Sequence, residues 1–109
     1  MSQPLEDWFK VSFDDSEINL DVHPAEQDIR KTQIPWADII RVCFKPGDFL
    51  SSDEIYIFTN QRPESYLIPT EAFGGFELWA EIINRGLFDA ELAIDVVSKS
   101  EGVFCWPEE

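Results

Sequence analysis

The pattern of apolar and polar positions changes once along the chain, close to Pro69. Before that residue apolar side chains recur at every second position, and after it they recur at helical spacing. Alternation puts apolar side chains on one face of a strand, whereas a 3.6-residue period puts them along one side of a helix. The pattern therefore predicts a sheet over residues 8–68, helices over residues 74–99 and an aromatic tail at residues 103–107.

The first two predicted strands alternate without interruption. WFKVSF carries Phe9, Val11 and Phe13 on one face, and INLDV repeats the alternation after the polar sequence DDSE. Short polar side chains bond to their own backbone and favour turns, so the two runs predict a β-hairpin. The next run, IRKTQI, is more polar and predicts a strand near a sheet edge, where charge discourages unwanted pairing.

The sequence IPWAD at residues 34–38 interrupts the alternation. Pro35 lacks an amide hydrogen and fixes its own φ, so a central strand cannot continue through it. This predicts a corner, after which the apolar residues Ile40, Val42 and Phe44 resume a strand.

Two further strands are predicted before the helices. EIYIFT is apolar on both faces, with Ile55 and Ile57 on one side and Tyr56 and Phe58 on the other. A strand of this kind is expected to be central and covered on both faces. ESYLI predicts the last strand, which ends before Pro69.

Two helices are predicted after the sheet. The apolar side chains of residues 76–83 spread over about 200° of a helix surface, as do those of residues 92–97. Gly86 suits the end of the first helix because glycine tolerates a left-handed backbone, and Asp89 suits the N-cap of the second. Stripes this wide predict that the helices pack on each other and on the tail. The alternative is that part of the apolar surface is kept for a partner.

Two segments carry a resemblance to a known family. IPWADIIRV resembles the I-P-aromatic-x-D-I-x-x-V signature of bacterial pleckstrin-homology-like domains, and IYIFT followed by ESYLIPTEAFGGFELWAEII resembles the remainder of such a domain. The similarity covers residues 8–85. It implies an α+β fold with a strongly bent antiparallel sheet or partly open barrel of about six strands, capped by a C-terminal helix. This chain adds a second short helix, and a small α+β protein of another topology is the alternative. The family resemblance implies a module for binding or assembly without catalytic residues.

Length and charge narrow the classes of protein. The 109 residues suit a single domain over residues 1–109, and 22 acids against 8 bases give a net charge of −14. Without a cluster of Lys and Arg, neither nucleic acid nor an anionic membrane is expected as a partner. The charge is explained by solubility or by a basic protein partner, and a homo-oligomer is left open.

The location of the protein is predicted from its ends and its cysteines. MSQPLEDWFK has neither the basic nor the apolar region of a secretory signal, and no stretch approaches a membrane span. With only two cysteines in no CxxC spacing, a cytoplasmic protein of bacterial type with reduced cysteines is predicted.

Candidate catalytic and metal-binding groups are few. The single histidine, His23, lies in a predicted turn, and Cys43 has no helix N-terminus or cationic cluster placed to activate it. Cys43 is predicted to be a small filler on its strand, and Cys105 to pack between Phe104 and Trp106. DDSEINLD lacks the glycine and the terminal glutamate spacing of a calcium loop. No catalytic residue, cofactor or metal site is predicted.

Aromatic and acidic residues at corners and chain ends are the candidate contact residues. Trp and Tyr at partly exposed positions are common binding hot spots, although each could instead fold back over an end of the sheet. Trp8 and Trp79 are expected in the core. The candidate partner-binding residues are Trp36, Asp48, Phe49, Leu50, Asp53 and Trp106.

Three functions follow, in order of preference. The first is a non-enzymatic protein-interaction module that uses an acidic surface and the loop at residues 46–53. The second is an immunity-type inhibitor of a basic toxin such as a nuclease, which small size and acidity favour. The third is a small enzyme that uses carboxylates or Cys43.

Overall fold

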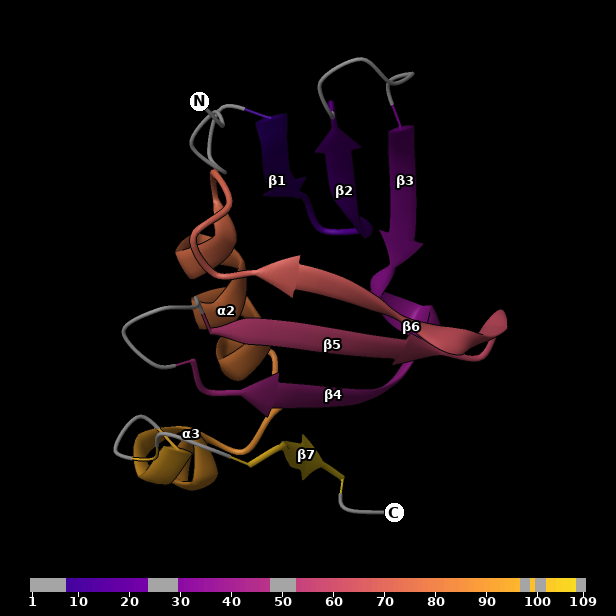
Figure 1. Ribbon diagram of the computed structural model, residues 1–109. Coiled ribbons are helices and arrows are strands. Elements are labelled where there is room, and N and C mark those ends of the chain that lie inside the picture. The colour runs from indigo at the N-terminus through magenta and orange to yellow at the C-terminus, as the bar shows by residue number, and fades with distance from the viewer. Residues whose placement is uncertain (1–7, 24–29, 48–52, 97–98, 100–101, 108–109) are drawn as a thin grey trace.

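The computed structural model describes residues 8–23, 30–47, 53–96, 99 and 102–107. Over these residues the chain is an α+β protein of two antiparallel sheets and two helices. Figure 1 shows the strands of the first sheet running across those of the second, with the helices gathered at one side of the molecule. The first sheet contains, in order, β1 (Phe9–Phe13), β2 (Glu17–Val22) and β3 (Arg30–Pro35). The second contains, in order, β6 (Arg62–Pro69), β5 (Glu54–Thr59), β4 (Ile39–Lys45) and β7 (Phe104–Trp106). The helices are α2 (Gly75–Asn84) and α3 (Ala90–Val96).

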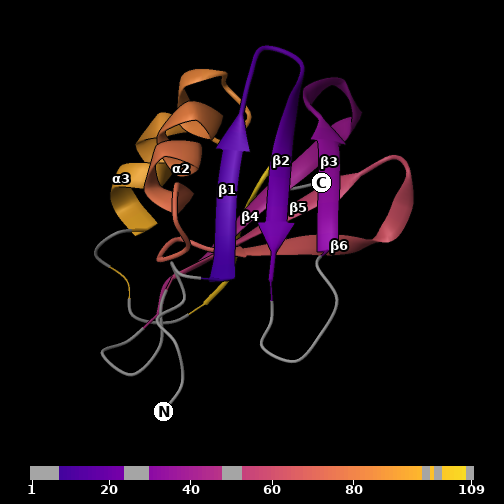
Figure 2. The same cartoon turned by 90° about the horizontal axis from the view of Figure 1, so that it is seen from above.

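The core forms where the inner faces of the two sheets meet the helices. Figure 2 shows both helices together on the same side of the sheets. Each fully buried Ile or Leu side chain contributes about 1.5–3 kcal/mol relative to an exposed one. The buried apolar residues that make up this core include Val11, Ile18 and Ile34 from the first sheet, Val42, Ile55, Ile57 and Ile68 from the second, and Leu78, Ile82, Phe88 and Val96 from the helical region.

The predicted hairpin and edge strand are confirmed. β1 pairs with β2 in antiparallel register from Phe9↔Val22 to Phe13↔Ile18, and β3 lies at the edge of the three-stranded sheet. In the turn, the Asp14 carboxylate accepts hydrogen bonds from the backbone N–H groups of Ser16 (2.8 Å) and Glu17 (3.0 Å). Short polar side chains are common in turns because they form such hydrogen bonds with the nearby backbone.

The predicted corner after Pro35 is confirmed, but the strands before and after it lie in different sheets. A short 3-10 helix, η1 (Trp36–Asp38), re-directs the chain between β3 and β4. The neighbours of β4 in its sheet are β5 and β7, and β3 pairs with β2. The predicted α+β class with antiparallel strands is confirmed, but the described strands form two sheets that do not close, where one strongly bent sheet or a partly open barrel was predicted, because Pro35 and the helical turn end the pairing at this point.

The second sheet also contains a strand that was not predicted. The aromatic tail supplies β7, which pairs with β4 through Val42↔Trp106, Cys43↔Cys105 and Phe44↔Phe104. The described part of the chain thus has seven strands instead of about six. A three-residue run is too short to show an alternation, so only its long-range pairing reveals the strand.

Cys43 and Cys105 form a disulfide across the β4–β7 pair, with a Cα–Cα distance of 4.0 Å. The prediction that both cysteines are reduced is wrong, and Cys43 is half of a cross-link rather than a simple filler. The two residues are 62 positions apart in the sequence but directly opposite in the register of the sheet. Their spacing along the chain could not indicate this pairing.

β5 is central, as predicted, since it pairs with both β4 and β6. Its two faces are unequal, however: Ile55 and Ile57 are fully buried, whereas Tyr56 and Phe58 are half-buried. The Tyr56 hydroxyl donates to Glu54 Oε1 (3.0 Å). Burial first, and this bond second, raise the pKa of Tyr56. The outer face of the second sheet is therefore less covered than the pattern of the strand predicted.

The ends of both helices agree with the sequence. Gly86 has a φ of +76° directly after α2, and the Asp89 carboxylate accepts a hydrogen bond from Leu92 N–H (2.9 Å) at the start of α3. Neither helix among the described residues has the length and apolar character that crossing a bilayer requires.

The wide apolar stripes are not fully buried. α2 buries Leu78 and Ile82 but leaves Phe76 64% exposed, and α3 buries Val96 but leaves Ile94 71% exposed. The two helices do contact each other, as expected, but the exposure of Phe76 and Ile94 shows that packing within the described residues leaves part of both apolar stripes uncovered.

Candidate functional site

Trp36 lies in the core rather than on the surface. Its side chain is buried, and its indole Nε1–H donates to the backbone oxygen of Asp14 (2.7 Å). Its ring lies edge-on to the ring of Phe13. Trp36 is thus buried at the corner, where the sequence predicted a contact residue. Its indole folds back under the β1–β2 turn.

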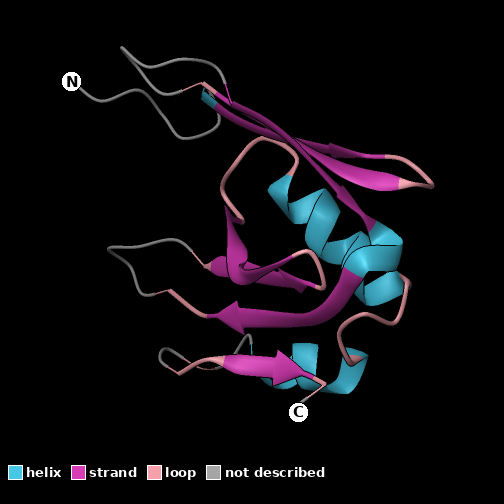
Figure 3. Cartoon of the chain, turned by 90° about the vertical axis from the view of Figure 1, so that its right-hand side faces the viewer, coloured by secondary structure: helices cyan, strands magenta, loops and turns pink. Residues whose placement is uncertain are grey.

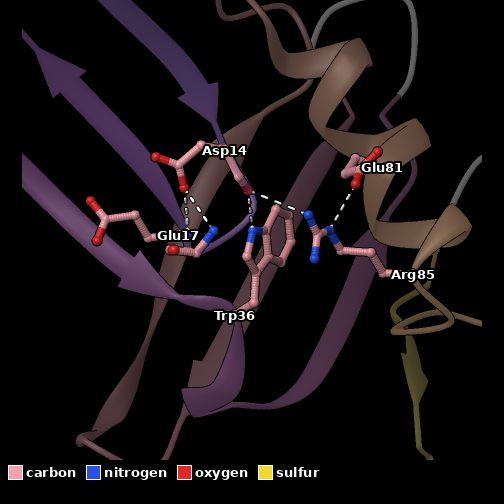
Figure 4. Close-up of polar contacts among 6 residues, drawn as sticks. Asp14, Glu17, Trp36, Glu81 and Arg85 are labelled. Atoms are coloured by element: carbon pink, nitrogen blue, oxygen red, sulfur yellow. Dashed lines mark hydrogen bonds and ion pairs between the residues drawn. The ribbon is translucent and has the colours of Figure 1, made fainter.

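Arg85 completes the surroundings of Trp36 (Figure 4). Its guanidinium lies 4.1 Å from the centre of the indole ring, and its Nη2 donates to the same Asp14 oxygen at 3.3 Å. Its Nε also forms an ion pair with Glu81 (2.8 Å) one helical turn away. The backbone N–H groups of Ser16 and Glu17, with a smaller effect of Arg85, hold the pKa of the Asp14 carboxyl below its ordinary value of 3.8. This cluster ties the end of α2 to the hairpin turn and the corner, so its role is structural.

The predicted contact loop is described only at its base. Asp48, Phe49 and Leu50 lie outside the described residues. Asp53 accepts a hydrogen bond from Gly47 N–H through its carboxylate (2.6 Å), and its backbone oxygen accepts one from Thr70 N–H (3.0 Å). The base of the loop is therefore fixed beside the turn that leads from β6 into α2.

Two exposed aromatic rings lie at this point of the chain, Phe73 at 62% in the turn and Phe76 at 64% in the first turn of α2. We call these two rings, with the exposed acids Glu71 and Glu77 that flank them in the sequence, the Phe73–Phe76 surface. The sequence pattern did not predict it, because Phe76 fits the apolar stripe of the helix. The sequence signal that could have indicated this surface is the pair of glycines between the two rings. Glycines allow backbone segments to approach closely, and the flanking side chains then stay at the surface.

The backbone that carries these rings is tightly held. Val11 N–H donates to the Phe73 oxygen (2.7 Å), and Phe73 N–H donates to the Phe9 oxygen (2.9 Å), so the turn pairs with the edge of β1. Gly74 follows with a φ of +82°, where a side chain would be strained. A fixed backbone lowers the entropy that a contact residue loses on binding. The Phe73 ring is thus presented on a preorganised backbone, and the Phe76 ring lies in the helix that follows.

The charge around the two rings is mostly negative. Glu71 and Glu77 are exposed on either side of them in the sequence, while Lys10 lies opposite Phe73 on β1. Glu77 also stands in the first turn of α2, where a carboxylate interacts favourably with the helix dipole. Residues 71–96 contain six acids and one base, Arg85, which already pairs with Glu81. The helical side of the molecule therefore has a local excess of negative charge.

Trp106 is the predicted contact residue that does reach the surface. It is 39% exposed and borders a small hollow of about 100 Å³ at the β7 edge of the second sheet. Ile40, which is 57% exposed, lies on the same hollow. The residues that line this Trp106 hollow are Ile39, Ile40, Arg41, Gly86, Leu87, Trp106 and Pro107.

The structure does not bring the candidate reactive groups together. His23 is exposed, and Cys43 is held in the disulfide with Cys105. Among the residues with described positions, no group of three His, Cys, Asp or Glu side chains is arranged to hold a metal ion. The Phe73–Phe76 surface is therefore the arrangement with the most evident capacity for recognition.

Comparison with protein families, curated proteins and solved structures gives no match. The resemblance to pleckstrin-homology-like domains stays a prediction, and the candidate site rests on its geometry alone.

Proposed function

We propose that this chain is a non-enzymatic protein-interaction module that binds a basic protein through the Phe73–Phe76 surface. The observation that carries the proposal is the exposure of two phenylalanine rings, Phe73 at 62% on a backbone held against β1 and Phe76 at 64% in the first turn of α2. Aromatic side chains account for much of the energy of protein interfaces, and neighbouring exposed ones commonly mark a contact surface.

The apolar part of the surface supplies affinity. An aromatic side chain buries about 150–250 Å² when a partner covers it, and apolar area contributes about 25 cal/mol per Å². Only part of this energy appears as binding, because association costs translational and side-chain freedom. Two rings on a fixed frame are sufficient for a hot spot, provided that the partner offers an apolar depression.

The charged part of the surface selects the partner. Glu71 and Glu77 flank the rings, and the whole chain carries a net charge of −14. Such a field accelerates the approach of basic molecules and repels nucleic acid and anionic lipid. The partner we propose therefore combines apolar side chains with Lys or Arg. Lys10 beside Phe73 would have to face an acceptor or solvent in the complex.

A pleckstrin-homology-like architecture is proposed for the fold. The corner at IPWAD between β3 and β4, the antiparallel strands and the helix after β6 support this assignment. Members of that family are mostly modules for binding or assembly, which agrees with the proposed function.

The second candidate function is an immunity-type inhibitor of a basic toxin such as a nuclease. The six acids against one base over residues 71–96 favour it, since a basic active site attracts a compact anionic protein. The thiol form of the third hypothesis is not proposed, because Cys43 is cross-linked to Cys105.

The experiment is capture of a partner from the native lysate by the full chain, followed by calorimetric titration of the purified partner. We expect Phe73→Ala and Phe76→Ala each to weaken binding about tenfold or more, which corresponds to about 1.4 kcal/mol. Ile94→Ala is the matched control, because Ile94 is equally apolar and 71% exposed but lies on α3. We expect this variant to bind as the unaltered chain does.

Two outcomes would reject the proposal. One is a partner that binds the Phe73 and Phe76 variants as tightly as the control. The other is a chain that only associates with itself and recovers no stoichiometric partner. Rescue of cells from a basic toxin encoded beside this chain would support the inhibitor form of the proposal.

A further inference from the structure

The last described strand, β7, is short and lies at the edge of the second sheet. β7 has three residues, and its partner strand is β4. It is joined to β4 by the disulfide at its middle residue, Cys105. A strand of three residues opens easily unless something ties it down. The disulfide is therefore a major part of what holds β7 in place.

The register places the disulfide and the aromatic side chains of β7 on opposite faces. Phe104 and Trp106 stand opposite Phe44 and Val42, both of which are buried in the core. Phe104 packs against that core, and Trp106 borders the Trp106 hollow. Cys43 and Cys105 occupy the alternate face, which is the less covered outer face of the second sheet.

The two sulfur-bearing residues differ in exposure. Cys43 is 3% exposed, whereas Cys105 is only half-buried on the strand at the sheet edge. Figure 3 shows β7 and α3 together at the end of the molecule away from the first sheet. A reductant can therefore approach the Cys105 sulfur from the edge without passing through the core.

We infer that the Cys43–Cys105 disulfide is a thiol-operated latch, and that its reduction releases β7 from β4 while the rest of the fold persists. Release removes Phe104 from the core margin and Trp106 from its hollow. It also leaves the edge of β4 at Val42–Phe44 without its strand partner, so that backbone groups and apolar side chains are newly exposed to solvent. This inference does not depend on the proposed function, because it concerns the opposite edge of the molecule from the Phe73–Phe76 surface.

The reductant is a dithiol, and the exchange balances as follows. One thiolate of the dithiol attacks Cys105 Sγ, and Cys43 Sγ leaves as a thiolate that takes a proton from water. The second thiol of the reductant, as its thiolate, then attacks the reductant's own sulfur in the mixed disulfide and releases the thiolate of Cys105, which also takes a proton from water. The two protons gained by the protein balance the two that the dithiol releases. Two electrons pass to the protein, which ends with two thiols, while the dithiol becomes a cyclic disulfide.

The test compares hydrogen exchange in the oxidised full chain before and after treatment with dithiothreitol. We expect the amides of β7, and those amides of Val42–Phe44 that point toward β7 rather than β5, to exchange about tenfold faster or more after reduction, because local opening replaces a tethered strand. Amides of β1, β2 and the β5–β6 pair should keep their protection. Alkylation should detect two new thiols, and reoxidation with oxidised glutathione should restore the original exchange pattern.

Single-cysteine variants supply the matched controls. Cys105→Ser should show fast exchange in β7 with or without dithiothreitol, and its response to the reductant should be absent. Cys43→Ser removes the same disulfide by replacing its buried cysteine. Its β7 amides should also exchange fast with or without dithiothreitol. If Cys43→Ser does not fold, Cys105→Ser and the oxidised and reduced forms of the unaltered chain still decide the question.

Three results would overturn the inference. They are unchanged exchange in β7 after complete reduction, loss of protection throughout the chain, and a failure of reoxidation to restore the protection of β7. The first would mean that pairing and packing hold the strand without the bond. The second would mean that the disulfide stabilises the fold as a whole, and the third that opening is not a reversible switch.

Discussion

At the scale of single residues, two tryptophans illustrate how the same side chain serves different purposes. Trp36 donates a hydrogen bond of 2.7 Å to Asp14 O, lies under the Arg85 guanidinium and is buried. Trp106 is 39% exposed at the edge of the second sheet. Nothing in the residue type distinguishes them, since Trp is amphipathic and occurs in both settings. The surrounding partners decide which one is structural.

Replacement of these residues by phenylalanine tests that difference. Trp36→Phe removes the indole N–H and part of the ring beneath Arg85, and should lower the free energy of unfolding by about 1–2 kcal/mol. Trp106→Phe is the matched control and should change it by about 0.5 kcal/mol or less, as at other surface positions. Urea denaturation followed by far-ultraviolet circular dichroism measures both values. Equal losses in the two variants would contradict the structural role of Trp36.

At the scale of elements, the start of α2 is positioned by its close approach to the end of β6. A Cβ atom at Gly75 would lie 2.5 Å from the Thr70 oxygen and 2.8 Å from the Pro69 oxygen, well inside the contact distance of about 3.5 Å. The same turn pairs with β1 through Phe73. The position of α2 and the presentation of the two exposed rings therefore have one common cause.

Gly75→Ala tests this close approach. Alanine favours helix by about 1 kcal/mol over glycine, but we expect the collision with backbone oxygens to outweigh this gain and destabilise the protein by about 2–3 kcal/mol. Gly86→Ala is the control, because no atom lies within 4 Å of its added Cβ and only the left-handed backbone opposes it, at about 1 kcal/mol. Thermal and urea unfolding should show a larger loss of stability for Gly75→Ala than for Gly86→Ala. A larger loss for Gly86→Ala would contradict the argument.

At the scale of the whole molecule, the net charge of −14 acts on folding and on binding in opposite directions. A compact anionic chain repels itself, so screening by salt should stabilise it. A basic partner is attracted by the same charge, so screening should weaken the proposed complex. Added salt should therefore raise the stability of the isolated chain and lower the affinity for a basic partner, which distinguishes the two effects of the charge.

We expect the urea midpoint of the isolated chain to rise when the ionic strength increases from about 0.01 M to about 0.1 M, where the Debye length falls from roughly 30 Å to roughly 10 Å. Sodium chloride is the suitable salt, because sulfate also strengthens apolar burial. Glu64→Lys, at an exposed position of β6 away from the helix ends, should be more stable than the unaltered chain at low salt and respond less to added salt. A midpoint that falls or does not move would show that self-repulsion is unimportant here.

Local sequence patterns were sufficient to predict most strands, turns and helix ends, because each of these features depends on residues that are neighbours in the sequence. The hairpin of β1 and β2, the corner after Pro35, the central position of β5 and the two helix ends at Gly86 and Asp89 were all predicted. Alternation, turn residues and caps are short-range properties, so the chain itself encodes them.

The candidate site was much less predictable. Of the six predicted contact residues, Trp36 is buried, Asp53 lies at the base of its loop and Trp106 is exposed, while Asp48, Phe49 and Leu50 lie outside the described residues. Phe73 and Phe76 were not predicted at all. Whether an aromatic ring in an apolar stripe is covered depends on what packs above it, and a pattern along the chain contains no such information.

The sequence by itself determined the class of the fold, the kinds of elements and their order, the acidity of the surface and the scarcity of reactive groups. Only the tertiary structure decided that the strands form two sheets, that residues 104–106 pair with β4, and that Cys43 meets Cys105. It also decided which aromatic rings remain exposed. The physical reason is that these features depend on contacts between residues far apart in the chain. Their energies come from burial and pairing in three dimensions and leave no periodic trace in the sequence.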